Sequence, residues 1–189
     1  LREVILNYKS LYLNLEYLTN ENKNLRKVLN AENIINAKDI VLAKVLVDRN
    51  SPFLKTIIIN KGTQYGIKKG MPVTQNNYLV GRIVDTNYLS SRVLLLTDLN
   101  SRIPVSLDAD SSQAILTGSG TKNPKLEYLP EEYEFKEDVN VFASGKERIF
   151  IPGTPIGKTT EKGEVILYVD PNQLSFVTVI LTRNNKEQF

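Results

Sequence analysis

Residues 55–84 read KTIIINKGTQYGIKKGMPVTQNNYLVGRIV, and the fold class follows from this stretch. It holds three short apolar runs rich in β-branched residues, which is the composition of β-strands. A turn is predicted between the second and third runs at Asn76 and Asn77, because asparagine tolerates a positive φ angle better than most residues. Gly81, inside the third run, predicts a β-bulge or a close approach of another backbone. The three runs are 56–59, 71–74 and 78–84.

The same alternation of short apolar runs and turns continues towards the end of the chain. The joins carry Gly, Pro, Asn, Asp or Ser, which are the residues typical of turns. Twelve such runs are typical of a β-sandwich or of small β-barrels, and about 140 residues suffice for two six-stranded barrels. The chain is therefore predicted to be mainly β after residue 40. The predicted strands are 41–49, 55–60, 71–74, 78–86, 92–97, 102–107, 113–117, 125–129, 138–143, 155–159, 164–169 and 175–182.

Residues 1–33 differ from the rest, because their apolar side chains recur at steps of three and four. This heptad pattern predicts a coiled coil, whose a and d positions form a seam between two helices. With Leu15 at an a position, Asn22 falls at the next one, where a buried asparagine favours a two-stranded coil and fixes its register. The alternative is an amphipathic helix packed on its own domain, but the narrow apolar stripe favours the coiled coil. The predicted dimerisation residues are Leu11, Leu15, Leu18, Asn22, Leu25 and Leu29.

The composition excludes several kinds of site. The 189 residues contain 24 Lys and Arg, 21 Asp and Glu, 0 Cys and 0 His. A Cys/His zinc site, a cysteine nucleophile and a Ser-His-Asp triad are therefore impossible, and no catalytic, cofactor or metal residue is predicted. A net charge of +3 without a basic stripe does not indicate a nucleic-acid partner. No apolar run is long enough for a transmembrane helix, but Leu1 lies inside the helical pattern, which leaves room for an upstream signal or membrane anchor.

Two motifs resemble catalytic or nucleotide-binding signatures without matching them. The GKT at 157–159 follows Gly153 with three intervening residues, one of them proline. A phosphate-binding loop needs four intervening residues and a helix after the motif, so 155–159 is predicted to be a strand. Ser144 and Lys146 can in principle form a Ser-Lys pair, which needs no histidine, but only their proximity marks them.

The run RIFIP at 148–152 has two interpretations. The simpler one is a buried strand of the last barrel. The sharper one is a partly exposed apolar edge that docks a partner, because apolar residues that remain exposed often mark interaction sites. Under this second interpretation the partner-binding residues are Ile149, Phe150 and Ile151.

Six groups of motifs together resemble the extracytoplasmic part of the rod shape-determining protein MreC family. Each motif is weak alone, but their order and spacing are similar to those of the family, and a coiled coil precedes them. The motifs are RNSPF at 49–53; INKG at 59–62 with GI at 66–67 and GMPV at 70–73; LVGRI at 79–83; SRVLLLTD at 91–98; SRIPV at 101–105; and FIPGTPIG at 150–157.

The resemblance implies a coiled-coil helix followed by two small six-stranded β-barrels, with a likeness to the chymotrypsin fold but no catalytic machinery. In the family, one barrel interrupts the other. Mapped onto this chain, residues 1–39 are expected to form the coiled coil and a link, and 183–189 a flexible tail. Residues 40–60 plus 111–182 are expected to form one barrel, and 61–110 the inserted one.

The resemblance further implies a non-enzymatic scaffold of the cell-wall elongation machinery, the elongasome, that maintains rod shape. Such a scaffold dimerises, self-associates further, and binds and activates the peptidoglycan transpeptidase, a class B penicillin-binding protein. It acts with MreD, RodA and the MreB cytoskeleton. It is anchored in the inner or cytoplasmic membrane by a single N-terminal helix, and the coiled coil and barrels lie in the periplasm or another extracytoplasmic space. No cofactor and no nucleic acid are expected.

Two other classes of protein share parts of this pattern. A periplasmic adaptor of a transport system, similar to the membrane-fusion proteins, also joins a coiled coil to β-barrels. Such adaptors usually carry a helical hairpin flanked by lipoyl halves, whereas in this chain one helix is predicted and none returns. A protease of the chymotrypsin type is the third class, and the absence of histidine argues against it.

Overall fold

The computed structural model describes residues 2–28, 40–46, 55–107, 112–130, 132–146 and 149–181, and within the helix it describes the side chains of residues 2–21. The chain divides into two compact units. We call Leu1–Lys38 the helical arm and Asp39–Phe189 the β unit. Each is described by itself below.

The helical arm contains one helix, α1 (Arg2–Val28), of 27 residues. At 1.5 Å per residue this helix is about 40 Å long. Its sequence contains neither glycine nor proline, the two residues that most disfavour a helix interior. Glu3 lies in the first turn, where the helix dipole favours a negative charge. The predicted helix is confirmed over these residues, and the predicted end of the coil with its link, at 30–39, lies outside the described residues.

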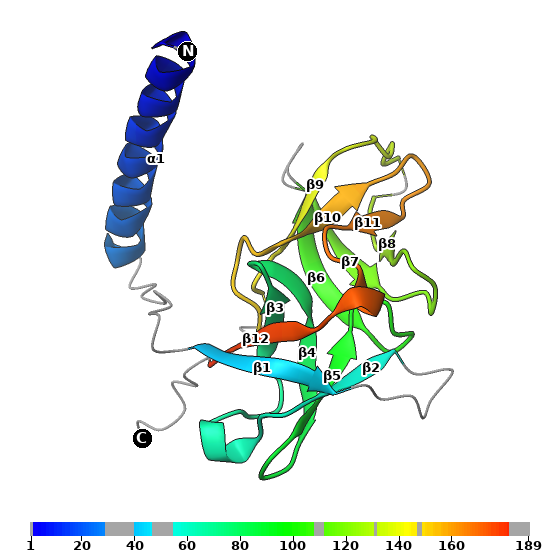
Figure 1. Cartoon of the computed structure of the whole chain (residues 1–189). Coiled ribbons are helices and arrows are strands. Elements are labelled where there is room, and N and C mark those ends of the chain that lie inside the picture. Colours follow the sequence, from blue (N-terminus) through cyan, green and yellow to red (C-terminus); the bar gives the residue numbers. More distant parts are fainter. Residues whose placement is uncertain are drawn as a thin grey trace. The chain divides into compact units, whose positions relative to one another are not determined.

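The first barrel of the β unit is closed and antiparallel, with strand order β1-β12-β3-β4-β5-β2. Figure 1 shows β1 and β12 side by side, although they come from opposite ends of the β unit. A 3-10 turn, η2 (Thr63–Tyr65), lies between the second and third strands. The six strands are β1 (Ile40–Leu46), β2 (Thr56–Ile59), β3 (Pro72–Gln75), β4 (Tyr78–Thr86), β5 (Ser91–Leu95) and β12 (Phe176–Ile180).

The stretch that begins this barrel folds as its turn residues predict. Asn76 and Asn77 have φ angles of 50° and 68°. They form a two-residue loop between the paired residues Gln75 and Tyr78, which is the type I′ geometry that suits the twist of a hairpin. A Cβ atom on Gly81 would lie 2.1 Å from the Leu94 carbonyl oxygen, and the β3–β4 register shifts beside it. The predicted turn and the predicted bulge are both confirmed.

The second sheet also has six strands, in the order β11-β10-β9-β6-β7-β8. Its two edge strands meet at an isolated antiparallel bridge between Lys125 and Glu164. Backbone hydrogen bonds from Leu126 N to Gly163 O and from Val165 N to Pro124 O flank this bridge and give the sheet its barrel-like form. The strands are β6 (Arg102–Leu107), β7 (Gln113–Thr117), β8 (Lys125–Glu127), β9 (Asn140–Ala143), β10 (Pro155–Thr159) and β11 (Val165–Leu167).

The predicted fold class is therefore confirmed, but the strands are shared between the barrels differently from the expected division. Residues 61–110 were expected to form the inserted barrel. Instead β3, β4 and β5 pair within the first barrel, where β5 pairs with β2 and β3 with β12. The inserted sheet runs from β6 to β11. The physical reason is that β2 pairs with β5 of the β4–β5 hairpin. The strands β6 to β11 pair with one another, and β12 returns to the first barrel between β1 and β3.

The two barrels share a junction built on the segment after β5. Leu79 and Leu96, which belong to first-barrel segments, pack in the hydrophobic core of the second sheet. Asp98 is fully buried, and its carboxylate accepts hydrogen bonds from Lys55 N and Asn100 N, both at 2.8 Å. A buried carboxylate needs such partners, because an unpaired one carries a large desolvation cost. Asp98 therefore fastens the start of β2 to the crossover between the barrels.

Candidate interaction surfaces

The predicted dimerisation seam lies along α1. The side chains of Leu11, Leu15 and Leu18 are between 58 and 59% exposed. Asn22 and Leu25 lie in the same helix, but only their backbone is described, and Leu29 lies outside the described residues. The helical arm by itself therefore does not bury these leucines. The dimerisation seam stays a prediction.

The exposed apolar residues of α1 are not confined to the narrow stripe that the sequence analysis assumed. In the first half of the helix, Ile5 and Tyr12 lie at e positions and Leu6 and Leu13 at f positions of the heptads that place Leu15 at a. All four are between 57 and 68% exposed. Because the e positions flank the seam, Ile5 and Tyr12 widen it without changing its register, whereas Leu6 and Leu13 at f positions lie on the opposite side of the helix. The signal was present in the sequence, but counting only the a and d positions missed it.

The run at 149–151 does not form the predicted exposed edge. Phe150 is 3% exposed and belongs to the core of the second sheet. Ile149 is partly buried and packs against the same core, and Ile151 is partly buried. The prediction that Phe150 binds a partner is therefore wrong, because this aromatic ring fills the space inside the second sheet. Of the three residues, Ile149 and Ile151 retain partial exposure.

An apolar surface that the sequence analysis missed lies on the outside of β1 and β12. We call Ile40, Leu42, Leu46 and Phe176 the β1–β12 face. Leu42 is 65% and Phe176 is 52% exposed. Phe176 lies opposite Lys44 in the β1–β12 pair and is a diagonal neighbour of Leu42, so their side chains share one surface.

The signal for this face was the composition of β1. Its seven residues, IVLAKVL, are apolar at all positions but one, while alternate residues point into the barrel and out of it. Val41, Ala43 and Val45 contribute to the core. A strand whose outer face meets solvent normally carries polar residues there, so apolar residues on both faces indicate a second contact.

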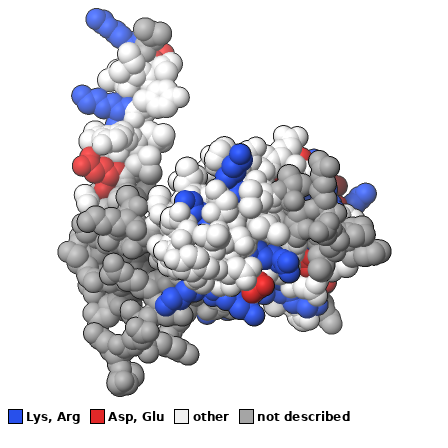
Figure 2. All heavy atoms as spheres, turned by 60° about the horizontal axis from the view of Figure 1, so that its bottom comes forward, with Lys and Arg blue, Asp and Glu red and all other residues white. Residues whose placement is uncertain are grey.

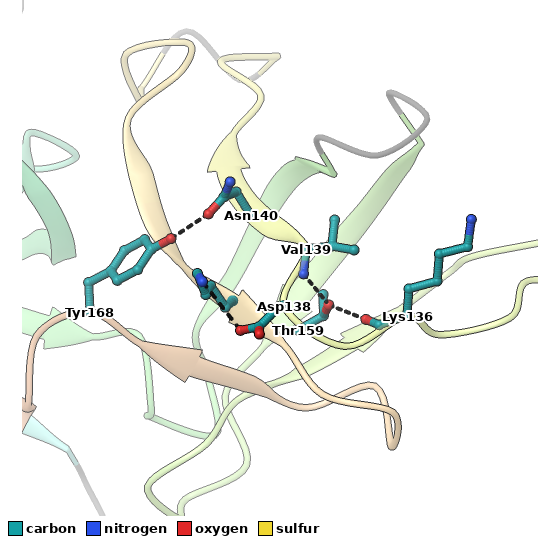
Figure 3. Close-up of polar contacts among 7 residues, drawn as sticks. Lys136, Asp138, Val139, Asn140, Thr159 and Tyr168 are labelled. Carbon is teal, nitrogen blue, oxygen red and sulfur yellow. Dashed lines mark hydrogen bonds and ion pairs between the residues drawn. The ribbon is translucent and has the colours of Figure 1, made fainter. Parts of the chain in front are cut away.

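The polar groups of the second sheet are engaged with one another. Figure 3 shows Tyr168 donating a hydrogen bond to Asn140 Oδ1, and Thr159 bridging the backbone of Lys136 and Val139. The first contact links the residue after β11 to β9, and the contacts of Thr159 fasten the segment before β9 to β10.

The GKT at 157–159 lies within β10, as predicted. Lys158 Nζ lies 3.3 Å from Asp138 Oδ1 on the surface, so this lysine neutralises a carboxylate. The motif is therefore a strand and not a phosphate loop.

The remaining catalytic candidates form no assembled site. Ser144 Oγ accepts a hydrogen bond from the backbone N of Lys146 at 3.5 Å, which is a turn contact. Among the described residues, no three Asp or Glu side chains lie together in a way that could hold a metal ion. A hollow beside Lys55, Thr97 and Lys122 measures about 110 Å³, well below the several hundred cubic ångströms typical of a ligand pocket. Within the described ranges, no helix is long and apolar enough to cross a membrane.

Comparison with known proteins identifies the family. Residues 45–181 match the family described as rod shape-determining protein MreC, barrel core. The chain belongs to the MreC family. The cell shape-determining protein MreC of Caulobacter vibrioides is 36% identical over 146 residues, which cover 75% of this chain and 42% of that protein. Together with the MreC of Cereibacter sphaeroides, of which 55% is covered, this shows that the chain spans about half the length of the curated relatives it matches.

Solved MreC structures share the fold. MreC of Listeria monocytogenes matches with a TM-score of 0.77 at 26% identity, covering 99% of this chain and 97% of that one. A chain of the complex between penicillin-binding protein PBP2 and MreC from Helicobacter pylori matches with a TM-score of 0.56, covering 76% of this chain and 99% of that one. At 11% identity this second likeness is one of fold alone. The resemblance to MreC predicted from the sequence motifs is thereby confirmed.

Proposed function

We propose that this chain is a non-enzymatic scaffold of the cell-wall elongation machinery, which maintains rod shape by dimerising through α1 and by binding and activating a class B penicillin-binding transpeptidase. Three observations support this function: membership of a cell shape-determining family, the exposed apolar seam of α1, and the exposed β1–β12 face. The complex of an MreC with a penicillin-binding protein supplies the class of the partner.

The observation that carries the proposal is the β1–β12 face. A closed barrel can bury its apolar residues inside, and this one has a complete core built from the inward residues of the same strands. Leu42 and Phe176 remain more than half exposed outside that core. Such neighbouring apolar residues gain by contact with another surface, at about 25 cal/mol for each Å² of apolar area buried. We assign the transpeptidase contact to this face, with the partly exposed Ile149 and Ile151 as further candidates.

Dimerisation through α1 follows from the energetics of the seam. Burying each leucine at a d position against its mate contributes about 1.5–3 kcal/mol. The loss of translational and rotational freedom opposes association by at least about 4 kcal/mol. A few such layers therefore give a dimer of modest stability, and its population depends on concentration. Further self-association is part of the same proposal.

The remaining partners and the location are proposed from the family resemblance. The scaffold acts together with MreD, RodA and the MreB system. A single membrane helix preceding the arm anchors it in the inner or cytoplasmic membrane, and the β unit works in the periplasm or extracytoplasmic space. Catalysis is left to the transpeptidase, because a chain with 0 His and 0 Cys lacks the residues that most often perform acid–base and nucleophilic chemistry.

The test is binding to the purified class B transpeptidase of the same organism, measured by biolayer interferometry. Leu42→Asp replaces an apolar contact of the β1–β12 face by a carboxylate, two residues from Lys44 on the same face. It is expected to weaken binding by more than about tenfold, since burying a charge in an interface is costly. Ile166→Asp is the matched control, because Ile166 is 53% exposed on β11 of the other sheet. Circular dichroism verifies that both variants fold.

Activation is tested in the same system. The transpeptidase rate is expected to rise when the chain is added and to stay at its basal value with Leu42→Asp. Absence of binding by the folded natural chain contradicts the proposed function. If Leu42→Asp and Ile166→Asp weaken transpeptidase binding equally, the assignment of the contact to the β1–β12 face is contradicted.

A further inference from the structure

Positive charge is concentrated in one stretch of this chain. Residues 49–97 contain 7 Lys and Arg but a single acidic residue, Asp85. The other residues hold the remaining 17 Lys and Arg and 20 Asp and Glu. The net charge is therefore +6 within this stretch and −3 outside it, which the overall value of +3 conceals. A local excess of this size creates a field that attracts anionic partners.

The fold gathers most of this charge on the first barrel, since five of the seven basic residues lie within 56–95. Residues 56–95 supply β2, η2, β3, β4 and β5, all of which belong to it. Asp85 lies opposite Arg92 in the β4–β5 pair, so the acidic side chain faces a basic neighbour. In Figure 2, where the end of the barrel with η2 and the β4–β5 turn comes forward, blue atoms predominate over red on the lower side of the β unit.

Exposed apolar and aromatic side chains lie among these charges. Tyr88 and Leu89, in the turn between β4 and β5, are 69% and 62% exposed, and Tyr65 at the end of η2 is 41% exposed. Lys61 Nζ lies 3.8 Å from the centre of the Tyr65 ring, and Lys68 and Lys69 follow η2 on the surface. We call these six residues the basic tip: Lys61, Tyr65, Lys68, Lys69, Tyr88 and Leu89.

The two loops of the basic tip are held together by their backbones. Thr63 N donates to Asn87 O at 2.9 Å, and Gln64 N donates to Tyr88 O at 3.4 Å. Gly62 allows this approach, because a Cβ atom there would lie 2.1 Å from Asn87 O. The tyrosines, the leucine and the lysines are thus presented by one packed structure rather than by two independent loops.

We propose that the basic tip docks on an anionic phospholipid surface. Lysines near such a surface are attracted to its phosphate groups, and exposed tyrosine and leucine side chains insert at the level of the headgroups. A soluble polyanion can pair with the lysines, but it offers no apolar region in which Leu89 and Tyr88 can be buried. The combination therefore favours a membrane surface, and this contact is separate from the transpeptidase contact on β1 and β12.

The test is cosedimentation of the full chain with vesicles of phosphatidylcholine alone or mixed with phosphatidylglycerol, at low and high salt. We expect binding to the phosphatidylglycerol vesicles only, weakened by salt because screening shortens the reach of the charges. Lys68→Glu with Lys69→Glu is expected to weaken binding by more than about tenfold, since each lysine near an anionic surface is worth about fivefold. Tyr88→Ser is expected to weaken it severalfold.

Two matched variants serve as controls. Lys125→Glu with Lys162→Glu changes the net charge equally but on the second sheet, where both lysines are exposed. Tyr128→Ser removes a tyrosine that is 76% exposed away from the basic tip. Neither control is expected to change binding. Three results would each overturn the proposal. They are equal binding to both kinds of vesicle, an equal loss of vesicle binding in the control variants, and capture of the chain by heparin without binding to vesicles.

Discussion

In α1, the ten large apolar side chains among its described residues are between 55 and 69% exposed. In the β unit, two clusters of buried residues fill the two barrels, and residues such as Ile59, Val73, Val105 and Ile156 have no exposed surface. The β unit therefore buries two apolar cores of its own, whereas the described apolar side chains of α1 remain more than half exposed. From this contrast we expect that substitutions in the barrel cores change the free energy of unfolding, and that substitutions on the apolar side of α1 change the association constant.

The largest effect is expected from Phe150→Ala. This ring is buried in the second core, so its loss should lower the free energy of unfolding by about 3–5 kcal/mol. Ile151→Ala, one residue along and partly exposed, is the matched control and should cost much less. Denaturant titration of the β unit measures both. Equal costs for the two variants would show that Phe150 does not occupy the core.

A smaller effect, and one on association alone, is expected from Asn22→Leu. An asparagine at an a position lowers the stability of a coiled coil while restricting its partners and register. Its replacement should tighten the dimer and allow trimers or mixed orientations, with the unfolding of the β unit unchanged. Sedimentation equilibrium over a range of concentrations measures this. An unchanged association constant would place Asn22 outside the seam.

The smallest effect concerns acid stability at Asp170. The hydrogen bond from Asn172 N holds the pKa of this carboxyl below its ordinary value of 3.8, and Lys122 adds to the effect. Because the folded pKa is lowered, the stabilisation is present above the ordinary pKa and is lost as the pH falls through the folded value. Asp170→Asn should therefore flatten the acid side of the melting temperature profile. Asn172→Ala keeps the backbone N–H donor and should preserve most of the pH dependence of the melting temperature. If both variants flatten the profile equally, the backbone hydrogen bond is not the cause of the lowered pKa.

Much of the fold could be predicted from local pattern, because strand and turn chemistry is local. The Asn76-Asn77 turn and the Gly81 bulge depend on the φ preferences of the residues themselves, and the heptads of α1 depend on spacing alone. The division into barrels depends on pairings such as β12 with β1, between residues more than a hundred positions apart. No local pattern encodes which distant strand becomes the neighbour.

The candidate surfaces could be predicted less well, for a related reason. An apolar run such as Ile149-Phe150-Ile151 reads the same whether it faces a core or a partner, and only the fold placed Phe150 inside. The β1–β12 face joins residues from two strands that are remote in sequence, so neither strand alone showed a patch. The basic tip likewise needed the contact of η2 with the β4–β5 turn before its charges and aromatic residues formed one surface.

The contrast between the helical arm and the β unit is tested most directly by sedimentation velocity of Leu18→Asp beside Tyr17→Asp. Both substitutions place a carboxylate in the same turn of α1, but Leu18 lies at a d position of the seam and Tyr17 at a c position outside it. At a concentration at which the natural chain sediments as a dimer, Leu18→Asp should sediment as a monomer with a folded β unit, and Tyr17→Asp as a dimer. A dimer that survives Leu18→Asp would contradict the account, because the interface would then lie in the barrels.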